Sequence, residues 1–134
     1  MEIVELLIQS GFEIKGDFQE DVEKAQERLG LKFSIEFKKY LVNYGQLSIG
    51  YQEITGISPV DYLDVVNVTE YEKRYVNKFL DDMYVVCRLE VDGIVIWQRT
   101  NGEVYQTVPG GEPEKIQNSF VEYLEKEILP NAIE

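Results

Sequence analysis

Residues 27–56, ERLGLKFSIEFKKYLVNYGQLSIGYQEITG, contain the change of periodicity that decides the fold. Apolar residues in the middle of this stretch recur at the spacing of a helix that faces a core; they are Phe37, Tyr40, Leu41 and Tyr44. Ser34 can cap this helix, and Gly45 can end it with a positive φ. Apolar residues then alternate with polar ones, which predicts a half-buried strand through Leu47, Ile49 and Tyr51.

This helix–glycine–strand segment resembles the defining pattern of the SUKH superfamily, which includes bacterial toxin-immunity proteins and a yeast cell-wall synthesis regulator. The matching residues are Glu27, Leu29, Gly30, Phe37, Tyr40, Leu41, Tyr44, Gly45 and Gly56. Phe33 and Ser34 stand where the family often has Leu-Pro. The order of the later elements also resembles the family, so the resemblance implies one SUKH-like domain over residues 1–134. The matching residues are mainly architectural, so they imply a fold more than a chemistry.

The size and composition indicate a globular protein. The chain has 134 residues, of which 44% are hydrophobic, enough for a substantial core. It has no apolar run near the ~20 residues of a membrane span. Its first residues lack the basic region of a signal peptide. A single cysteine cannot form an internal disulfide, which suits the cytoplasm.

The net charge of −12 has two interpretations. It can simply keep the protein soluble. Alternatively, the acidic surface meets a basic partner. Nucleic acids and anionic membranes are not expected partners, because both attract positively charged surfaces.

Capping residues and apolar spacing predict further helices at residues 3–8, 17–29, 62–79 and 119–130. Asp17 and Glu20 form a capping box, as do Ser119 and Glu122. The third of these helices follows a Ser58-Pro59 start, and its Val-rich part near residues 67–69 is a candidate break. Pro130 is expected to end the last helix.

The clearest β signal lies in three runs, at residues 84–91, 94–100 and 103–108. They are joined by Asp92-Gly93 and Asn101-Gly102, both favoured in type I′ hairpin turns, which predicts an antiparallel three-stranded meander.

Two-residue turns would fix the strand register. Cys87 would then lie opposite Gln98 and Leu89 opposite Ile96, on an apolar face covered by helices. Trp97 would lie on the other face, opposite Arg88.

The two faces lead to two interpretations of Trp97. It is either a partly covered aromatic ring packed on an arginine stem or an anchor for a partner, since Trp and Arg are enriched at interface hot spots. Cys87 is interpreted as a small buried hydrophobe rather than a reactive thiol.

The sequence lacks the usual catalytic and metal-binding groups. It has no histidine, one cysteine and no glycine-rich phosphate loop before a helix. Acidic pairs such as Asp81-Asp82 fall in expected connections rather than in a cleft. We therefore predict a protein that is not an enzyme and has no cofactor or metal.

The predicted fold is α+β, with N-terminal helices and a C-terminal helix packed on an antiparallel sheet that contains the three-stranded meander. The resemblance implies an immunity protein that binds and neutralises a cognate secreted toxin domain, and the acidic charge suits a basic nuclease-type toxin. The alternative is a regulatory protein-interaction scaffold, as in the yeast relative. The candidate partner-binding residues are acids expected near the sheet and two aromatic residues: Tyr51, Glu53, Asp61, Asp64, Glu70, Asp81, Asp82, Glu90 and Trp97.

Overall fold

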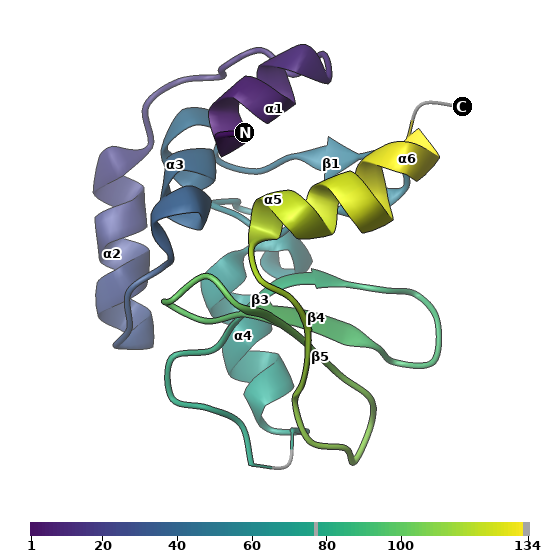
Figure 1. Ribbon diagram of the computed structural model, residues 1–134. Coiled ribbons are helices and arrows are strands. Elements are labelled where there is room, and N and C mark those ends of the chain that lie inside the picture. Colours follow the sequence, from purple (N-terminus) through teal and green to yellow (C-terminus); the bar gives the residue numbers. More distant parts are fainter. Residues whose placement is uncertain (77, 133–134) are drawn as a thin grey trace.

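The protein is built on an antiparallel sheet with helices against both faces, as seen in a computed structural model that describes residues 1–76 and 78–132 (Figure 1). Within this described part, the sheet has four strands in chain order: β3 (Tyr84–Arg88), β4 (Val95–Gln98), β5 (Val104–Thr107) and β6 (Glu114–Gln117). The predicted α+β fold is confirmed. The fourth strand, β6, was not predicted, because its sequence EKIQ is mostly polar. Residues 77, 133 and 134, which the predicted helix 62–79 and domain 1–134 include, lie outside the described part.

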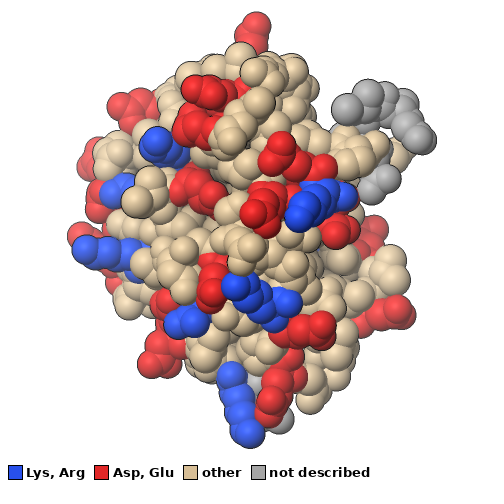
Figure 2. All heavy atoms as spheres, viewed as in Figure 1, with Lys and Arg blue, Asp and Glu red and all other residues tan. Residues whose placement is uncertain are grey.

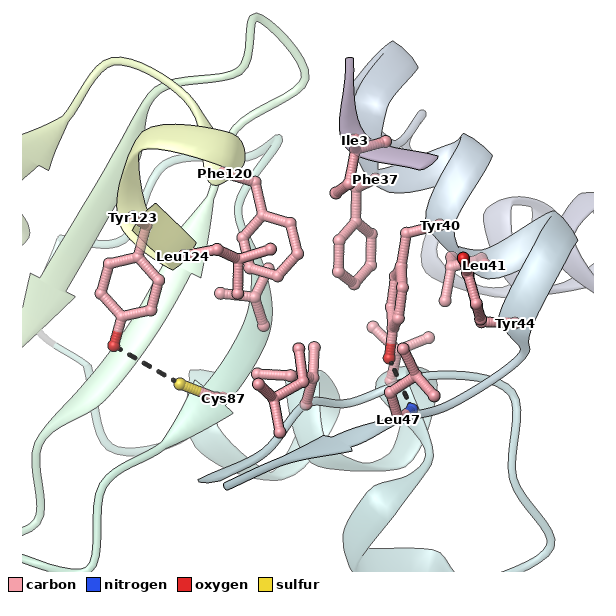
Figure 3. Packing of buried hydrophobic residues seen from close by; sticks show 14 of the residues in the cluster. Ile3, Phe37, Tyr40, Leu41, Tyr44, Leu47, Cys87, Phe120, Tyr123 and Leu124 are labelled. Atoms are coloured by element: carbon pink, nitrogen blue, oxygen red, sulfur yellow. Dashed lines mark hydrogen bonds between the residues drawn. The ribbon is translucent and has the colours of Figure 1, made fainter. Parts of the chain in front are cut away.

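One face of the sheet carries the main hydrophobic core. The helices that contribute to it are α1 (Ile3–Gln9), α2 (Gln19–Leu29), α3 (Ile35–Tyr44), α5 (Phe120–Tyr123) and α6 (Leu129–Ala132), together with the π-helical turn Leu124–Ile128 and the start of α4 (Val65–Lys73). Figure 3 shows the rings of α3 facing those of α5, with the centroids of Phe37 and Phe120 5.4 Å apart in edge-to-face geometry. Cys87 lies in this core, with its Sγ 3.7 Å from the hydroxyl oxygen of Tyr123, so its prediction as a buried residue is confirmed.

Helix α3 begins and ends where the sequence predicts. Ser34 Oγ accepts a hydrogen bond from the third amide of the helix at 3.1 Å, and Gly45 has a φ of +71°. Within the helix, the Tyr40 hydroxyl accepts a hydrogen bond from the Leu47 amide at 3.0 Å (Figure 3) and donates one to the Thr55 carbonyl at 2.9 Å. Because both partners lie beyond the helix, this one side chain fixes the path of the chain after Gly45.

The chain after α3 forms a hairpin rather than the single predicted strand. Its strands are β1 (Ser48–Ile49) and β2 (Gln52–Glu53). Gly50, with a φ of +61°, allows the chain to reverse at Gly50-Tyr51. Tyr51 is therefore not on the buried side of a strand; it lies at the hairpin tip and is 99% exposed.

Gly56 lies directly against the end of α3. A Cβ atom added to Gly56 would come within 2.0 Å of the Gly45 carbonyl oxygen and 2.8 Å of the Gln46 Cα. The same carbonyl accepts a hydrogen bond from the Ile57 amide at 2.9 Å. Only glycine fits, because any side chain would have to push one backbone segment away from the other.

We expect Gly56→Ala to lower the free energy of unfolding by at least about 1–3 kcal/mol, because the clash is with backbone atoms that cannot rotate away. Gly16→Ala is the matched control, since its added Cβ would meet the Phe18 ring at an ordinary 3.6 Å. This control should be neutral or stabilise the protein by less than about 1 kcal/mol. Urea denaturation measures both, and equal midpoints for the two variants would contradict the close-contact explanation.

The turn between β3 and β4 has the predicted conformation but a different register. Asp92-Gly93 has φ angles of +56° and +67°, as expected for a type I′ turn. The strands pair Cys87 with Ile96, whereas the predicted register pairs Leu89 with Ile96. The Leu89 amide donates a hydrogen bond to the Ile94 carbonyl at 2.9 Å, so the loop between these two residues is longer than two residues. A bulge in β3 adds a second shift, and the predicted register is wrong.

The turn between β4 and β5 also differs from the prediction. Gly102 has a φ of +98°, but Asn101 does not have the expected positive φ. The Arg99 amide bonds the Glu103 carbonyl at 2.9 Å, so residues 100–102 form a three-residue loop. This loop type ends in a glycine bulge, which moves the register by one residue.

Trp97 lies on the sheet face opposite Cys87 and Ile96, as predicted, but that face is not open, because the Trp97 side chain has 0% of its surface exposed. It packs in a second, smaller core with Val85, Val95 and Val68, the last from helix α4 (Val65–Lys73). The indole nitrogen donates a hydrogen bond to the Thr107 hydroxyl at 2.9 Å. The prediction of an open face failed because antiparallel sheets often leave one face to water, whereas here α4 covers it.

The remaining helices differ from the predictions mainly at their ends. Helix α2 begins at Gln19, two residues after Asp17. Helix α4 begins after Asp64, whose carboxylate accepts a hydrogen bond from the Asn67 amide at 3.1 Å, and it continues unbroken through residues 67–69. A 3₁₀ turn, Asp61–Leu63, precedes it in place of the expected helix start.

The C-terminal helix continues past the proline that was expected to end it. Pro130 lies within α6, directly after a π-helical turn at Leu124–Ile128 that interrupts the α-helical hydrogen-bond pattern. The Ser119 cap of this helix is confirmed. Among the helices of the described part, none combines the length and apolar character needed to cross a bilayer.

Candidate protein-binding surface

Three exposed tyrosines and an arginine form a surface around the start and end of α4. Tyr62 in the 3₁₀ turn, Tyr71 in α4 and Tyr75 just after it are 59%, 48% and 58% exposed. The rings of Tyr71 and Tyr75 lie 5.2 Å apart. We call these tyrosines, together with Arg88 and Leu89 at the end of β3, the tyrosine surface. Clustered exposed aromatic side chains of this kind mark protein-interaction sites.

Arg88 holds this surface together. Its Nη1 donates to the Glu72 carboxylate at 3.1 Å, and its Nη2 donates to the Tyr62 backbone carbonyl at 3.2 Å. One guanidinium group therefore links β3, α4 and the 3₁₀ turn. The Glu72 side chain is only 14% exposed, so water screens this ion pair less than a fully exposed one.

Three shallow depressions adjoin Arg88. The first, of about 340 Å³, lies between α4 and the sheet turns and is mainly apolar. The second, of about 400 Å³, lies between Tyr62 and Tyr71 and includes Asp61. The third, of about 250 Å³, includes Glu53 and Glu90.

The fold brings three of the predicted acids together at these depressions: Glu53, Asp61 and Glu90. They come from β2, the 3₁₀ turn and the turn between β3 and β4, and all three are exposed. Tyr51 lies beside this group, because its depression shares Leu89 with the one that holds Glu53. Sequence order alone does not show that these segments meet.

The other predicted residues have different surroundings. Asp64 is the cap of α4, and Asp82 pairs with Arg99 at 2.9 Å, so both hold the fold. Glu70 lies 3.8 Å from Arg28 of α2, while Asp81 is exposed before β3. Trp97, the second predicted aromatic anchor, is buried beneath α4.

The sequence reasoning missed Tyr62, Tyr75, Tyr71 and Arg88 as surface-forming residues. A signal was present, since Tyr71 and Tyr75 are four residues apart and share a helical face. The pairing of Arg88 with Glu72, in contrast, depends on how β3 packs against α4.

Acidic groups outnumber basic ones around the tyrosine surface. Glu53, Asp61, Glu72 and Glu90 surround the single cation of Arg88 in its depressions. On the face shown in Figure 2, Asp and Glu side chains lie across most elements, among fewer Lys and Arg. The side chain of Tyr75, as a hydrogen-bonding neighbour, raises the pKa of Tyr71 above its ordinary value.

The described residues offer little for catalysis. Among residues 1–76 and 78–132, no three His, Cys, Asp or Glu side chains are grouped so as to hold a metal ion. Burial raises the pKa of the Cys87 thiol to about 12, which leaves it protonated and unreactive at neutral pH. The exposed side chains of the tyrosine surface are placed for non-covalent contacts.

We expect the Arg88–Glu72 pair to have a coupling free energy of about 1–2 kcal/mol in a double-mutant cycle, because it is partly buried and joins three elements. The cycle uses Arg88→Ala, Glu72→Ala and the double variant in urea denaturation. The exposed Lys24–Glu20 pair, 3.7 Å apart within α2, is the control and should show less than about 0.5 kcal/mol. A coupling no larger than that of the control would mean that Arg88 does not organise the surface.

Comparison with known proteins adds two findings. A family model described as SMI1-KNR4 cell-wall, of the SUKH group, matches residues 2–129. A crystal structure of a protein from Pseudomonas syringae pv. tomato has a TM-score of 0.74 and 13% sequence identity, covering 96% of this chain and 98% of that chain. At that identity the likeness concerns the fold alone. No curated protein matches the chain significantly.

Proposed function

Because the chain belongs to the SUKH family, of the SMI1-KNR4 cell-wall type, we propose that it is an immunity protein that binds and neutralises a cognate secreted toxin domain. Family membership supports an immunity or regulatory role in general. We further propose that residues 1–134 act as one domain in the cytoplasm, without catalysis. The absence of histidine and the buried thiol support a non-catalytic role.

The observation that carries the proposal is a group of exposed acids beside the tyrosine surface, Glu53, Asp61 and Glu90, which we call the acidic rim. A nuclease-type toxin binds phosphate and therefore has a basic surface. An acidic protein can cover that surface, exclude the nucleic acid and be attracted to it over a distance. Tyrosine side chains add contact area at low conformational cost, which favours tight association.

A regulatory scaffold that binds cellular proteins is the second candidate. The cell-wall name of the matching family favours it. The two functions differ in partner: the immunity function requires a toxin that is harmful in the absence of this protein. Survival of cells that express a candidate cognate toxin domain, with and without this chain, separates them.

We expect association with that toxin domain to be steered by charge. The rate should fall steeply with added salt, because the reach of the field shrinks to ~8 Å at physiological ionic strength. Dissociation should change less, since it depends on central desolvated contacts. The variant Glu53→Lys, Asp61→Lys, Glu90→Lys should associate more slowly in stopped-flow measurements and protect cells less.

A control variant separates the local rim from net charge. Glu5→Lys, Glu13→Lys, Asp21→Lys changes the net charge by the same amount at exposed positions in the N-terminal part. It should slow association less than the rim variant does. Asp64 and Glu70 are not altered, because Asp64 caps α4 and Glu70 lies against Arg28. An association rate that does not respond to salt, together with full protection by the rim variant, would contradict this mechanism.

A further inference from the structure

Two neighbouring depressions on the tyrosine surface differ in chemistry. The first is lined by apolar groups, among them Tyr75, Ile94, Val108 and Pro109. The second is lined by the polar residues Asp61 and Asn67 together with Tyr62 and Tyr71. Both depressions share Tyr71 and Arg88, so they adjoin. A partner can therefore fill both with side chains from one short segment.

The second depression suits a positively charged side chain. Tyr62, Tyr71 and Asp61 line it, and both tyrosine rings and carboxylates attract cations. Asp61 is exposed, and the hydrogen bond that its carboxylate accepts from the Asn67 side-chain amide is long at 3.4 Å, which leaves most of its acceptor capacity open. The charge of Arg88 is already offset by Glu72 at 3.1 Å.

The first depression suits a large apolar side chain. Tyr75 and Val108 are 58% and 47% exposed along it, and Ile94 and Leu89 are half-buried. Covering these groups removes apolar surface from water, which favours binding. The acids of the rim line the other two depressions. Charge therefore favours a cation in the second depression, and burial of apolar surface favours an apolar side chain in the first.

We propose that the tyrosine surface binds an extended segment of a partner protein that carries an arginine or lysine and, two positions away, a large apolar residue. The basic side chain lies between Tyr62 and Tyr71 beside Asp61, and the apolar side chain enters the neighbouring depression. In an extended chain, residues two apart point to the same side, roughly 7 Å from each other, which suits two adjoining depressions. The inference rests on the proposed function, in which the toxin supplies this segment.

The test is an NMR titration of the full ¹⁵N-labelled chain with synthetic peptides. The probe is acetyl-Gly-Arg-Thr-Leu-Gly-amide, and the comparison peptides replace Arg by Glu or Leu by Ser. We expect the probe to shift the amides of Tyr62, Tyr71 and Leu89 and to bind at least about fivefold more tightly than either comparison peptide, since each loses one of the two contacts. Equal affinities, shifts confined to other regions or no binding would overturn the proposal.

Two variants and a control make the titration specific. Tyr71→Ala removes the wall shared by both depressions, and Asp61→Lys reverses the charge at an exposed position. Each should weaken binding of the probe by at least about fivefold. Ile35→Ala, which truncates an apolar side chain that is 80% exposed outside the tyrosine surface, should leave binding unchanged. Unchanged binding by both surface variants would overturn the proposal.

The outcomes for this inference and for the proposed function can be told apart. If the chain neutralises the toxin but Tyr71→Ala and Asp61→Lys neutralise it equally well, the surface assignment is wrong and the immunity function stands. If the peptide binds as expected but the chain gives no protection, the immunity function is wrong and the recognition chemistry stands.

Discussion

The contact between Gly45 and Gly56 is the constraint on which the rest of the structure depends. It places the end of α3 against the chain that leads to α4, with backbone atoms too close for any side chain at Gly56. From there, the Gly56 amide bonds the Leu63 carbonyl at 2.9 Å, and the Gly56 carbonyl accepts from the Val65 amide at 2.8 Å. The 3₁₀ turn and the first residue of α4 are thus positioned by one residue. Tyr40 of α3 secures the intervening hairpin through its two hydrogen bonds.

Features set by neighbouring residues could be predicted from the sequence. The Ser34 cap, the end of α3 at Gly45 and the Asp92-Gly93 turn depend on local backbone chemistry. The covering of the second sheet face could not, because it depends on which helix packs there. Helix α4 covers the second face, so Trp97 is fully buried rather than partly covered, and a bulge in β3 shifts the predicted pairing.

In the candidate site, too, some features follow from single residues and others from the packing of distant segments. Glu53, Asp61 and Glu90 were selected as exposed acids, and exposure follows from residue type. Their convergence around Arg88 depends on the hairpin, the 3₁₀ turn and the β3–β4 turn meeting in space. The separate role of Asp64 is readable only from its hydrogen bond to the α4 backbone. The sequence thus predicted which acids are exposed. It did not predict that they lie together, because their grouping depends on how α4 packs on the sheet.

The division between the main core and the small core beneath α4 has a consequence for how the protein can change. The rings of Tyr62, Tyr71 and Tyr75 project from a backbone that is fixed by glycine contacts and by buried groups such as Trp97. Substitutions at these exposed rings leave the fixed backbone intact. Partner specificity can therefore change through substitution of a few exposed side chains. One scaffold can diverge toward different partners while each intermediate sequence still folds.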